Sequence, residues 1–160
     1  LTDSDLSPYL PLTENLTYPQ IHYLGYYLKW HPQSCYYYAV ENGGFEPSPE
    51  RTPGTYSKYN SIDDKIDDFH YWTTYQKFGI GRATYDASQE IRSGDITREE
   101  GVALVRRFDG EWPERFSEEI NHYLSVVGLP AFTKGRWLEL AEKFRSPHLW
   151  NEDKLRFQVE

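Results

Sequence analysis

The sequence predicts a mainly α-helical protein: a compact array of about five or six helices, with one short segment near the N-terminus that is compatible with a strand. Two observations favour helices. Apolar residues recur at helical spacings along most of the chain after position 61, and Gly or Pro interrupts these stretches at short intervals. The 160 residues suit one domain with a substantial core.

The N-terminal third is expected to be the least regular part. Residues 1–19 are rich in Pro, Thr, Ser and Asp without periodicity, which is typical of an irregular arm or linker. The aromatic and apolar segment 21–28 is compatible with a strand. Pro32 suits the first turn of a helix over 32–42, which Gly43 and Gly44 would end. Residues 45–60, rich in Pro, predict a long loop.

From Ser61 onward the pattern predicts consecutive helices. Ser61 is the expected N-cap of the first, which ends at Gly79, and its inward face would hold Ile62, Ile66, Phe69 and Thr73. The second, over 82–91, would bury Ala83, Ala87 and Ile91.

Three more helices follow. One starts at Thr97, whose spacing to Glu100 predicts a capping box. The next starts at Pro113 and the last near Thr133. Their expected inward residues are Phe116, Ile120, Leu124 and Val127, then Trp137, Leu140, Ala141 and Phe144. We therefore expect a helical domain over 20–150 and a frayed tail over 151–160.

Composition limits the classes of partner. The formal net charge of -8 disfavours nucleic acid and anionic membranes. No apolar run approaches the roughly 20 residues of a membrane helix, and no leader opens the chain, so we expect a cytoplasmic protein. Cys35 is the one cysteine; it is expected to be a buried small apolar residue, and it cannot form an internal disulfide. Methionine is absent even at position 1, which predicts a piece of a longer protein.

A Gly-Ile-Gly hinge between two predicted helices is the first candidate site. Gly79 and Gly81 would let a ligand approach the backbone, and the following helix N-terminus favours anions. Lys77 and Arg82 flank the hinge and could hold a phosphate. The alternative is an ordinary helix–turn–helix with solvated basic side chains.

Acidic residues and a histidine gather on the helix before this hinge. Asp67 and His70 lie three residues apart, so they share a face and could form a hydrogen bond suited to acid–base work or to sugar hydroxyls. A charged, solvated face is the alternative. Lys58 and Tyr59 precede this helix in a loop that could close over a phosphate. His22 and His31 lack the spacing of metal ligands, and no metal site is predicted.

Several segments resemble one known family. They are HYLGYYLKWHPQ, YYYAVENGGFEP, EKFRSPHLW and the long run from GTYSKYNSIDDKIDDFHYW to VALVRRFDGEWPE. Together, over roughly residues 6–150, they are similar to the C-terminal part of the N-acetyl sugar amidotransferases, the WbpG-like proteins of lipopolysaccharide O-antigen biosynthesis.

The resemblance implies a function for the longer protein. The family belongs to the PP-loop ATP pyrophosphatases and converts an acetamido group of a UDP-linked diacetamido uronic acid to an acetamidino group. A glutaminase subunit and an ammonia-channel subunit are its expected partners. ATP and Mg²⁺ would be bound by an N-terminal ATP domain that this chain lacks, so no cofactor is expected here and the chain alone would be inactive.

The resemblance also implies which residues bind substrate, without giving catalytic roles. Lys29 stands where superfamily members place a lysine after the last strand of the ATP sheet. Basic side chains suit the diphosphate and the uronate, and Asp67, His70 and Asp86 suit sugar hydroxyls or acetamido groups. The implied binding residues are Lys29, Lys58, Tyr59, Lys65, Asp67, His70, Lys77, Arg82 and Asp86.

Two other functions stay open. The domain could be a non-catalytic docking module for the ammonia-supplying subunits, which would show a broad exposed apolar patch. It could also act on glycosides with two carboxylates roughly 5–10 Å apart in a cleft.

Overall fold

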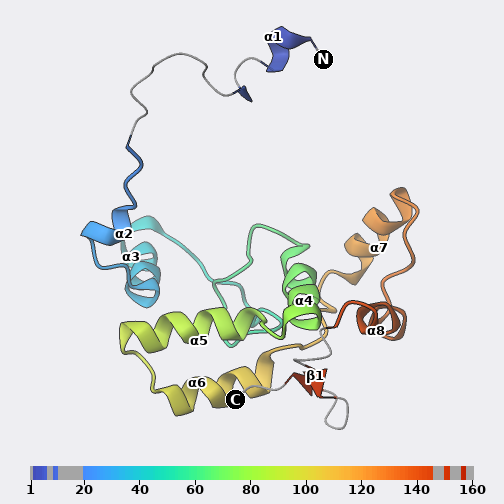
Figure 1. Ribbon diagram of the computed structural model, residues 1–160. Coiled ribbons are helices and arrows are strands. Elements are labelled where there is room, and N and C mark those ends of the chain that lie inside the picture. The colour runs from blue at the N-terminus through green and yellow to red at the C-terminus, as the bar shows by residue number, and fades with distance from the viewer. Residues whose placement is uncertain (1, 7–8, 11–19, 146–149, 152–155, 158–160) are drawn as a thin grey trace. The chain divides into compact units, whose positions relative to one another are not determined.

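The computed structural model describes residues 2–6, 9–10, 20–145, 150–151 and 156–157, shown in colour in Figure 1. They fall into two compact units, Leu1–Trp30 and His31–Glu160. Helices dominate both, which confirms the predicted mainly α fold. Most of the predicted arm and tail lies outside the described residues.

The N-terminal unit contains two short helices, α1 (Asp3–Leu6) and α2 (Leu24–Tyr27). The strand suggested for residues 21–28 is therefore wrong. The N–H of Leu28 donates to the carbonyl of Leu24 at 2.9 Å, closing a helical turn. A strand needs a neighbouring strand for its backbone groups, and the described residues of this unit contain none.

The second unit begins with α3 (Pro32–Gly43), close to its predicted bounds. His31 caps it by accepting a hydrogen bond from the N–H of Ser34 at 3.1 Å, and Gly44 ends it in the left-handed conformation. Cys35 is exposed on this helix, so its predicted burial is wrong. This helix contacts the helix over Arg82–Ser93 and leaves the Cys35 thiol exposed.

Helix α4 (Asp67–Phe78) begins later than predicted. Ser61 is not its N-cap: Ser61 has a positive φ, and its hydroxyl donates instead to the Asp67 carboxylate. The carboxylate of Asp64 accepts from the N–H of Ile66 at 2.8 Å, a local turn that competes with helix. Ile62 and Ile66 are exposed as a result, and the buried face is Asp68, Trp72 and Gln76.

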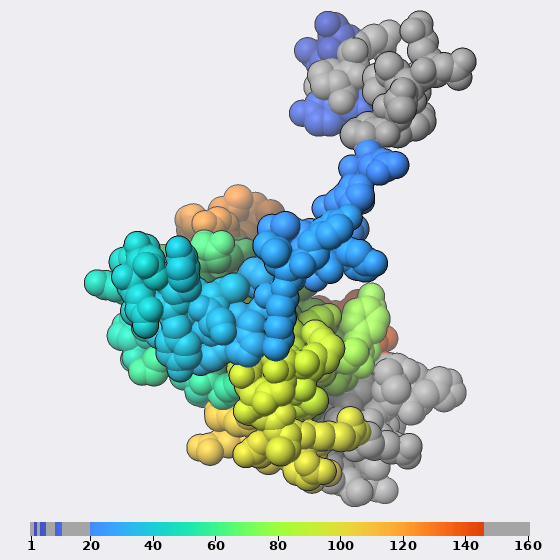
Figure 2. Space-filling view, turned by 90° about the vertical axis from the view of Figure 1, so that its left-hand side faces the viewer, coloured from blue at the N-terminus to red at the C-terminus, as the bar shows by residue number. Residues whose placement is uncertain are grey.

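Helices α5 (Arg82–Ser93) and α6 (Arg98–Phe108) lie against each other in Figure 1. Ala83 and Ala87 are buried as predicted, and Thr97 forms the predicted capping box with Glu100. Gly101 permits the close approach, because a Cβ there would lie 2.6 Å from Cδ1 of Ile91. Figure 2 shows α3, in light blue, on the surface beside the yellow-green α5.

Helices α7 (Ser117–Val126) and α8 (Lys134–Glu142) enclose an aromatic core with α4. Helix α7 begins after Pro113, which is fully buried rather than at the first helical position. The core contains Ile120, Leu124 and Phe132, packed against Phe69, Trp112, Phe116 and Trp137. Predicted burial of Val127 and Phe144 is wrong, since both are more than half exposed beyond the last packed turn of their helices.

The described C-terminal residues form two short antiparallel strands, β1 (Trp150–Asn151) and β2 (Arg156–Phe157), with Trp150 opposite Phe157. A search of the described residues for a helix long and apolar enough to cross a membrane finds none.

Candidate functional site

An anchored loop, residues 51–60, forms the base of the candidate site. The guanidinium of Arg51 donates to both carboxylate oxygens of Glu111 at 2.7 Å. The same arginine donates to the carbonyl of Thr55 at 2.6 Å, and Glu111 also accepts from the N–H of Gly54 at 2.8 Å. Such two-point charged bonds are strong and directional. These bonds hold the loop in place against Glu111.

The loop is also bonded to α5 through Asp86. This carboxylate accepts from the hydroxyl of Thr55 at 2.5 Å and from the amide of Asn60 at 2.8 Å. Arg82, one turn earlier on α5, brings its Nε to 3.5 Å from Asp86. Burial raises the pKa of Asp86, while the bonds from Thr55 and Asn60 and the charge of Arg82 oppose that rise. Asp86 thus acts as a structural anchor for the loop.

Arg82 lines a small pocket between α4, α5 and the loop. Its guanidinium carbon is 4.4 Å from the ring centre of Tyr71, and Nη1 is 3.4 Å from the carboxylate of Asp67. The pocket has a volume of about 130 Å³. Its lining, which we call the arginine pocket, is Pro32, Tyr59, Asn60, Tyr71, Arg82, Tyr85, Asp86, Gln89 and Glu90.

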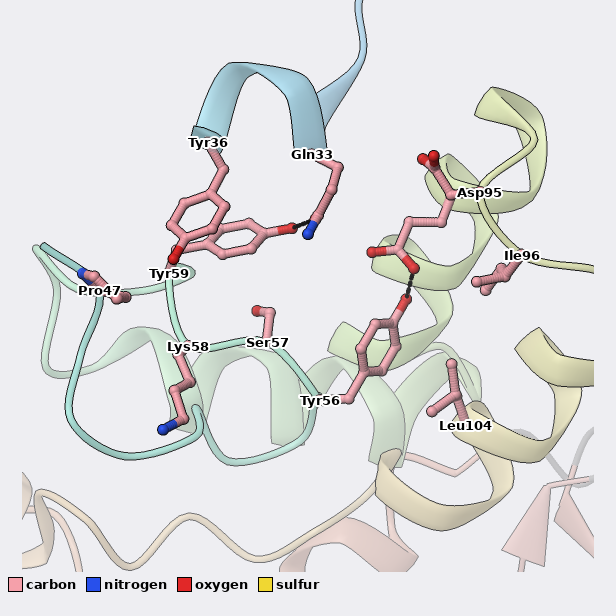
Figure 3. A pocket seen from close by; sticks show the side chains of 11 residues that line it. Gln33, Tyr36, Pro47, Tyr56, Ser57, Lys58, Tyr59, Asp95, Ile96 and Leu104 are labelled. Atoms are coloured by element: carbon pink, nitrogen blue, oxygen red, sulfur yellow. Dashed lines mark hydrogen bonds between the residues drawn. The ribbon is translucent and has the colours of Figure 1, made fainter. Parts of the chain in front are cut away.

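A larger cavity of about 520 Å³ adjoins it and shares Tyr59 and Glu90. Figure 3 shows it from close by. We call it the tyrosine cavity, lined by Gln33, Tyr36, Pro47, Tyr56, Ser57, Lys58, Tyr59, Glu90, Asp95, Ile96 and Leu104. The volume falls within the roughly 300–1,000 Å³ usual for small-molecule sites.

Two pairs of side chains shape the tyrosine cavity. The rings of Tyr36 and Tyr59 stack with centres 4.5 Å apart, and the hydroxyl of Tyr59 donates to Gln33 at 2.8 Å. The hydroxyl of Tyr56 donates to Glu90 at 3.0 Å. Burial, followed by the negative charges of Glu90 and Asp86, raises the pKa of Tyr59 to about 12, so this phenol stays protonated.

His31 and Asp95 join α3 to the turn after α5. Nε2 of His31 lies 3.0 Å from the Asp95 carboxylate. Nδ1 accepts from the Ser34 N–H, so Nε2 carries the ring proton in the neutral form and donates it to Asp95. This bond fixes the Tyr36 side of the cavity relative to the Glu90 side.

The Gly-Ile-Gly hinge does not hold a free anion site. The carboxylate of Asp109 accepts from the N–H groups of Gly81 at 3.1 Å and Thr84 at 3.2 Å, at the start of α5. A Cβ on Gly81 would lie 2.6 Å from Oδ1 of Asp109, so the glycine is needed for this contact. At the hinge, where a phosphate was one of the two interpretations, the protein's own carboxylate thus accepts from the N–H groups at the start of α5.

The structure brings together some of the predicted binding residues. Lys58 and Tyr59 line the tyrosine cavity, Arg82 and Asp86 line the arginine pocket, and Asp67 contacts Arg82. Within the described residues, Asp67 forms no hydrogen bond to His70, whose ring lies beside that of Tyr71.

The other predicted residues lie elsewhere. Lys65 pairs with Glu119 of α7 at 2.7 Å, and Lys77 lies over the ring of its neighbour Phe78. His70 is exposed on α4. Lys29 is exposed in the N-terminal unit.

Sequence reasoning missed Gln33, Tyr36, Tyr56, Glu90 and Asp95. One signal was present. Arg82, Asp86 and Glu90 recur every four residues on a helix whose adjacent face holds the buried Ala83 and Ala87. A polar stripe so regular on a packed helix indicates a lined pocket rather than free solvent.

Within the parts of the chain that the structure describes, no three His, Cys, Asp or Glu side chains are grouped so that they could hold an ion.

The fold and cavities define a helical domain with an aromatic, acidic cavity of ligand size. Residues 53–160 match the family model described as LPS biosynthesis protein WbpG-like, C-terminal domain. The chain belongs to this family and is related to lipopolysaccharide biosynthesis. No curated protein matches it. The matched region contains Tyr56, Tyr59 and Glu90 of the cavity, whereas α3 lies before it.

Proposed function

We propose that this chain completes the substrate site of an ATP-dependent amidotransferase. The whole enzyme would convert an acetamido group of a UDP-linked diacetamido uronic acid to an acetamidino group for the O-antigen of lipopolysaccharide. The observation that carries the proposal is the tyrosine cavity, placed within a domain of a lipopolysaccharide biosynthesis family.

The cavity suits a sugar carrying acetamido groups. Tyr36 and Tyr59 supply aromatic faces of the kind that pack on sugar rings and methyl groups. Phenol, amide and carboxylate groups around them can exchange hydrogen bonds with hydroxyl and amide groups. Lys58 stands at the same cavity and is the basic residue best placed for the uridine diphosphate end.

The remaining parts of the enzyme would lie outside this chain. ATP and Mg²⁺ would be held by the N-terminal ATP domain, and ammonia would come from a glutaminase through a channel-forming subunit, all in the cytoplasm. Consistent with this division, the start of α5 is closed to phosphate by Asp109.

A docking role is a second candidate, and an exposed apolar group at the end of α7 favours it. Tyr123, Val126, Val127 and Leu129 are each more than half exposed there. This surface could hold the ammonia-supplying subunits without excluding a sugar in the tyrosine cavity.

Calorimetric titration tests the proposal. The chain is titrated with the UDP-linked diacetamido uronic acid and, separately, with ATP. We expect the sugar nucleotide to bind and ATP not to bind. Replacing Tyr59→Ala should weaken sugar binding about tenfold, since an aromatic contact contributes about 1 kcal/mol or more. Tyr38→Ala, on the exposed side of α3, is the matched control. Absence of sugar binding to the folded chain would contradict the proposal and favour docking.

A further inference from the structure

The tyrosine cavity has an unbalanced charge. Glu90 and Asp95 line it, and Lys58 is the basic residue among its lining side chains. Lys58 does not neutralise Glu90, because its Nζ donates to the carbonyl of Pro49 at 3.1 Å. Figure 3 shows the Lys58 side chain pointing away from Tyr56.

His31 is not among the side chains that line the cavity. Its Nδ1 accepts the N–H of Ser34, and its Nε2 lies 3.0 Å from the Asp95 carboxylate. Arg82 lines the arginine pocket and not this cavity, and it contacts Asp67 and Asp86. The cavity therefore presents net negative charge to whatever enters it.

Each of the Glu90 and Asp95 carboxylates has an oxygen that accepts no hydrogen bond from the residues that the structure describes. In Glu90, Oε2 accepts from Tyr56, while Oε1 accepts no hydrogen bond from the described residues. In Asp95, Oδ1 faces His31, and Oδ2 is likewise without a donor among those residues. Two carboxylates each retain an oxygen that a ligand N–H could reach.

The aromatic wall adds a second preference for cations. Figure 3 shows the stacked Tyr36 and Tyr59 on one side, Tyr56 on the other and Ser57 between them. Tyr56 donates to Glu90. The faces of tyrosine rings attract cations, and the attraction grows when water is excluded. Aromatic faces together with carboxylates form the usual recognition site of an organic cation.

The reaction proposed above changes the charge at one point of the substrate. An acetamido group is neutral and has one N–H. The acetamidino group that replaces it gains a nitrogen, is protonated near neutral pH, and is a planar cation with several N–H donors. Its shape and donors match a carboxylate as a guanidinium does.

We propose that the tyrosine cavity recognises an amidinium cation, with Glu90 as its main acceptor, and so binds the acetamidino end of the product more tightly than the acetamido end of the substrate. This inference rests on the proposed function for the identity of the cation. The specificity for positive charge rests on the cavity alone.

Acetamidinium chloride and acetamide form a matched pair of probes, nearly equal in shape and different in charge. Amide chemical shifts of the labelled chain are followed by NMR during titration with each. We expect saturable shifts at Tyr56, Ser57 and Tyr59 with acetamidinium and about tenfold weaker binding of acetamide, as one charge-assisted hydrogen bond provides.

Glu90→Gln keeps an acceptor for the Tyr56 hydroxyl and should preserve the fold, yet it removes the charge. It should reduce acetamidinium binding about tenfold. Glu118→Gln, which removes the same charge from an exposed position on α7, should leave binding unchanged. The proposal is overturned if acetamidinium and acetamide bind equally well. It is also overturned if Glu90→Gln and Glu118→Gln weaken acetamidinium binding equally.

A second titration separates this inference from the proposed function. If the UDP-linked diacetamido sugar binds in the cavity but acetamidinium does not, the function stands and the cation site is wrong. If acetamidinium binds through Glu90 and neither the sugar nucleotide nor its acetamidino product binds, the cation site stands and the proposed substrate is wrong.

Discussion

The carboxylate of Asp109 accepts hydrogen bonds from both the hydroxyl and the backbone N–H of Thr84, at 2.5 and 3.2 Å. Through these bonds and one from Gly81, the end of α6 holds the start of α5. The N-terminus of a helix attracts anions, and here an internal side chain supplies the anion. Because Asp109 accepts from these N–H groups, they are not available to a phosphate at the Gly79–Gly81 hinge.

Asp109→Ala should lower the free energy of unfolding by about 2–3 kcal/mol, because buried N–H groups lose their acceptor. Urea unfolding measures this, with Asp63→Ala on the exposed surface as control. The variant should also be stabilised by added sulfate more than wild type is, since the helix N-terminus is then open. No loss of stability, with an unchanged sulfate response, would show that Asp109 does not cap α5.

Glu111→Gln should loosen the 51–60 loop. Burial raises the pKa of Glu111, but the bonds from Arg51 and the Gly54 N–H outweigh it and hold the pKa below its ordinary value. A lowered carboxyl pKa contributes stability that is present above the unfolded pKa and lost as pH falls through the folded pKa. In the wild type, the backbone N–H groups of the loop should therefore lose their protection against hydrogen exchange below about pH 4.5. In the variant they should lack that protection at every pH.

Hydrogen exchange measures this prediction. The N–H groups of Ser48 and Thr52 donate to the loop carbonyls of Lys58 and Ser57 at 2.8 and 3.0 Å, and they should exchange faster in Glu111→Gln. The N–H of Gly101, inside α6, is the internal reference. Uniform acceleration at all three would indicate global destabilisation and contradict a local role.

Asp68 should make the free energy of unfolding depend on pH in the opposite sense to Glu111. Burial raises its pKa to about 6 against the opposing charge of Arg115, whose guanidinium donates to both carboxylate oxygens at 3.1 Å. A raised pKa contributes stability that is fully present below the unfolded value of 3.8 and lost as pH rises through about 6.

Comparison with Asp68→Asn measures this contribution. As pH falls from 7 to 4, the free energy of unfolding of wild type should rise relative to the variant by about 2–3 kcal/mol. Chemical unfolding at several pH values gives the difference. A constant difference, or one that falls on acidification, would mean that Arg115 outweighs burial.

Gly110→Ala should be strongly destabilising. Gly110 has a φ of +78°, and a Cβ there would lie 2.3 Å from the Tyr75 ring. Gly128 has a φ of +70° with nothing within 4 Å of a Cβ, so Gly128→Ala separates backbone strain from the clash. We expect a loss of about 1 kcal/mol at Gly128 and about 2–4 kcal/mol at Gly110, where overpacking is added. Equal melting temperatures for the two variants would show that Tyr75 moves aside.

Local signals in the sequence were sufficient for several elements. The capping box at Thr97, Pro32 at the first turn of α3 and the inward Ala83 and Ala87 of α5 were all predicted. Each depends on residues within a turn or two of one another. The start of α4 was missed because a competing turn at Asp64 is equally local and the two signals cannot be ranked by inspection.

Only part of the candidate site was predicted from local signals in the sequence. Lys58, Tyr59, Arg82 and Asp86 were singled out and lie at the two adjoining pockets, whereas Lys65 and Lys77 lie elsewhere. Tyr36 and Glu90 were missed because their importance arises when α3, the loop and α5 meet. The sequence of one helix does not indicate which side chains from distant segments will pack against it.

From the sequence by itself came the helical class, the starts of α3, α5, α6 and α8, the family resemblance and a chemistry of tyrosines and charges. Only the tertiary structure decided that Asp109 fills the hinge, that Arg51 and Glu111 hold the loop, and that the cavity is acidic. The reason is physical. Helix formation is governed by short-range hydrogen bonding and periodicity, whereas the net charge of a cavity depends on which groups from distant segments pair with one another and which remain available to a ligand.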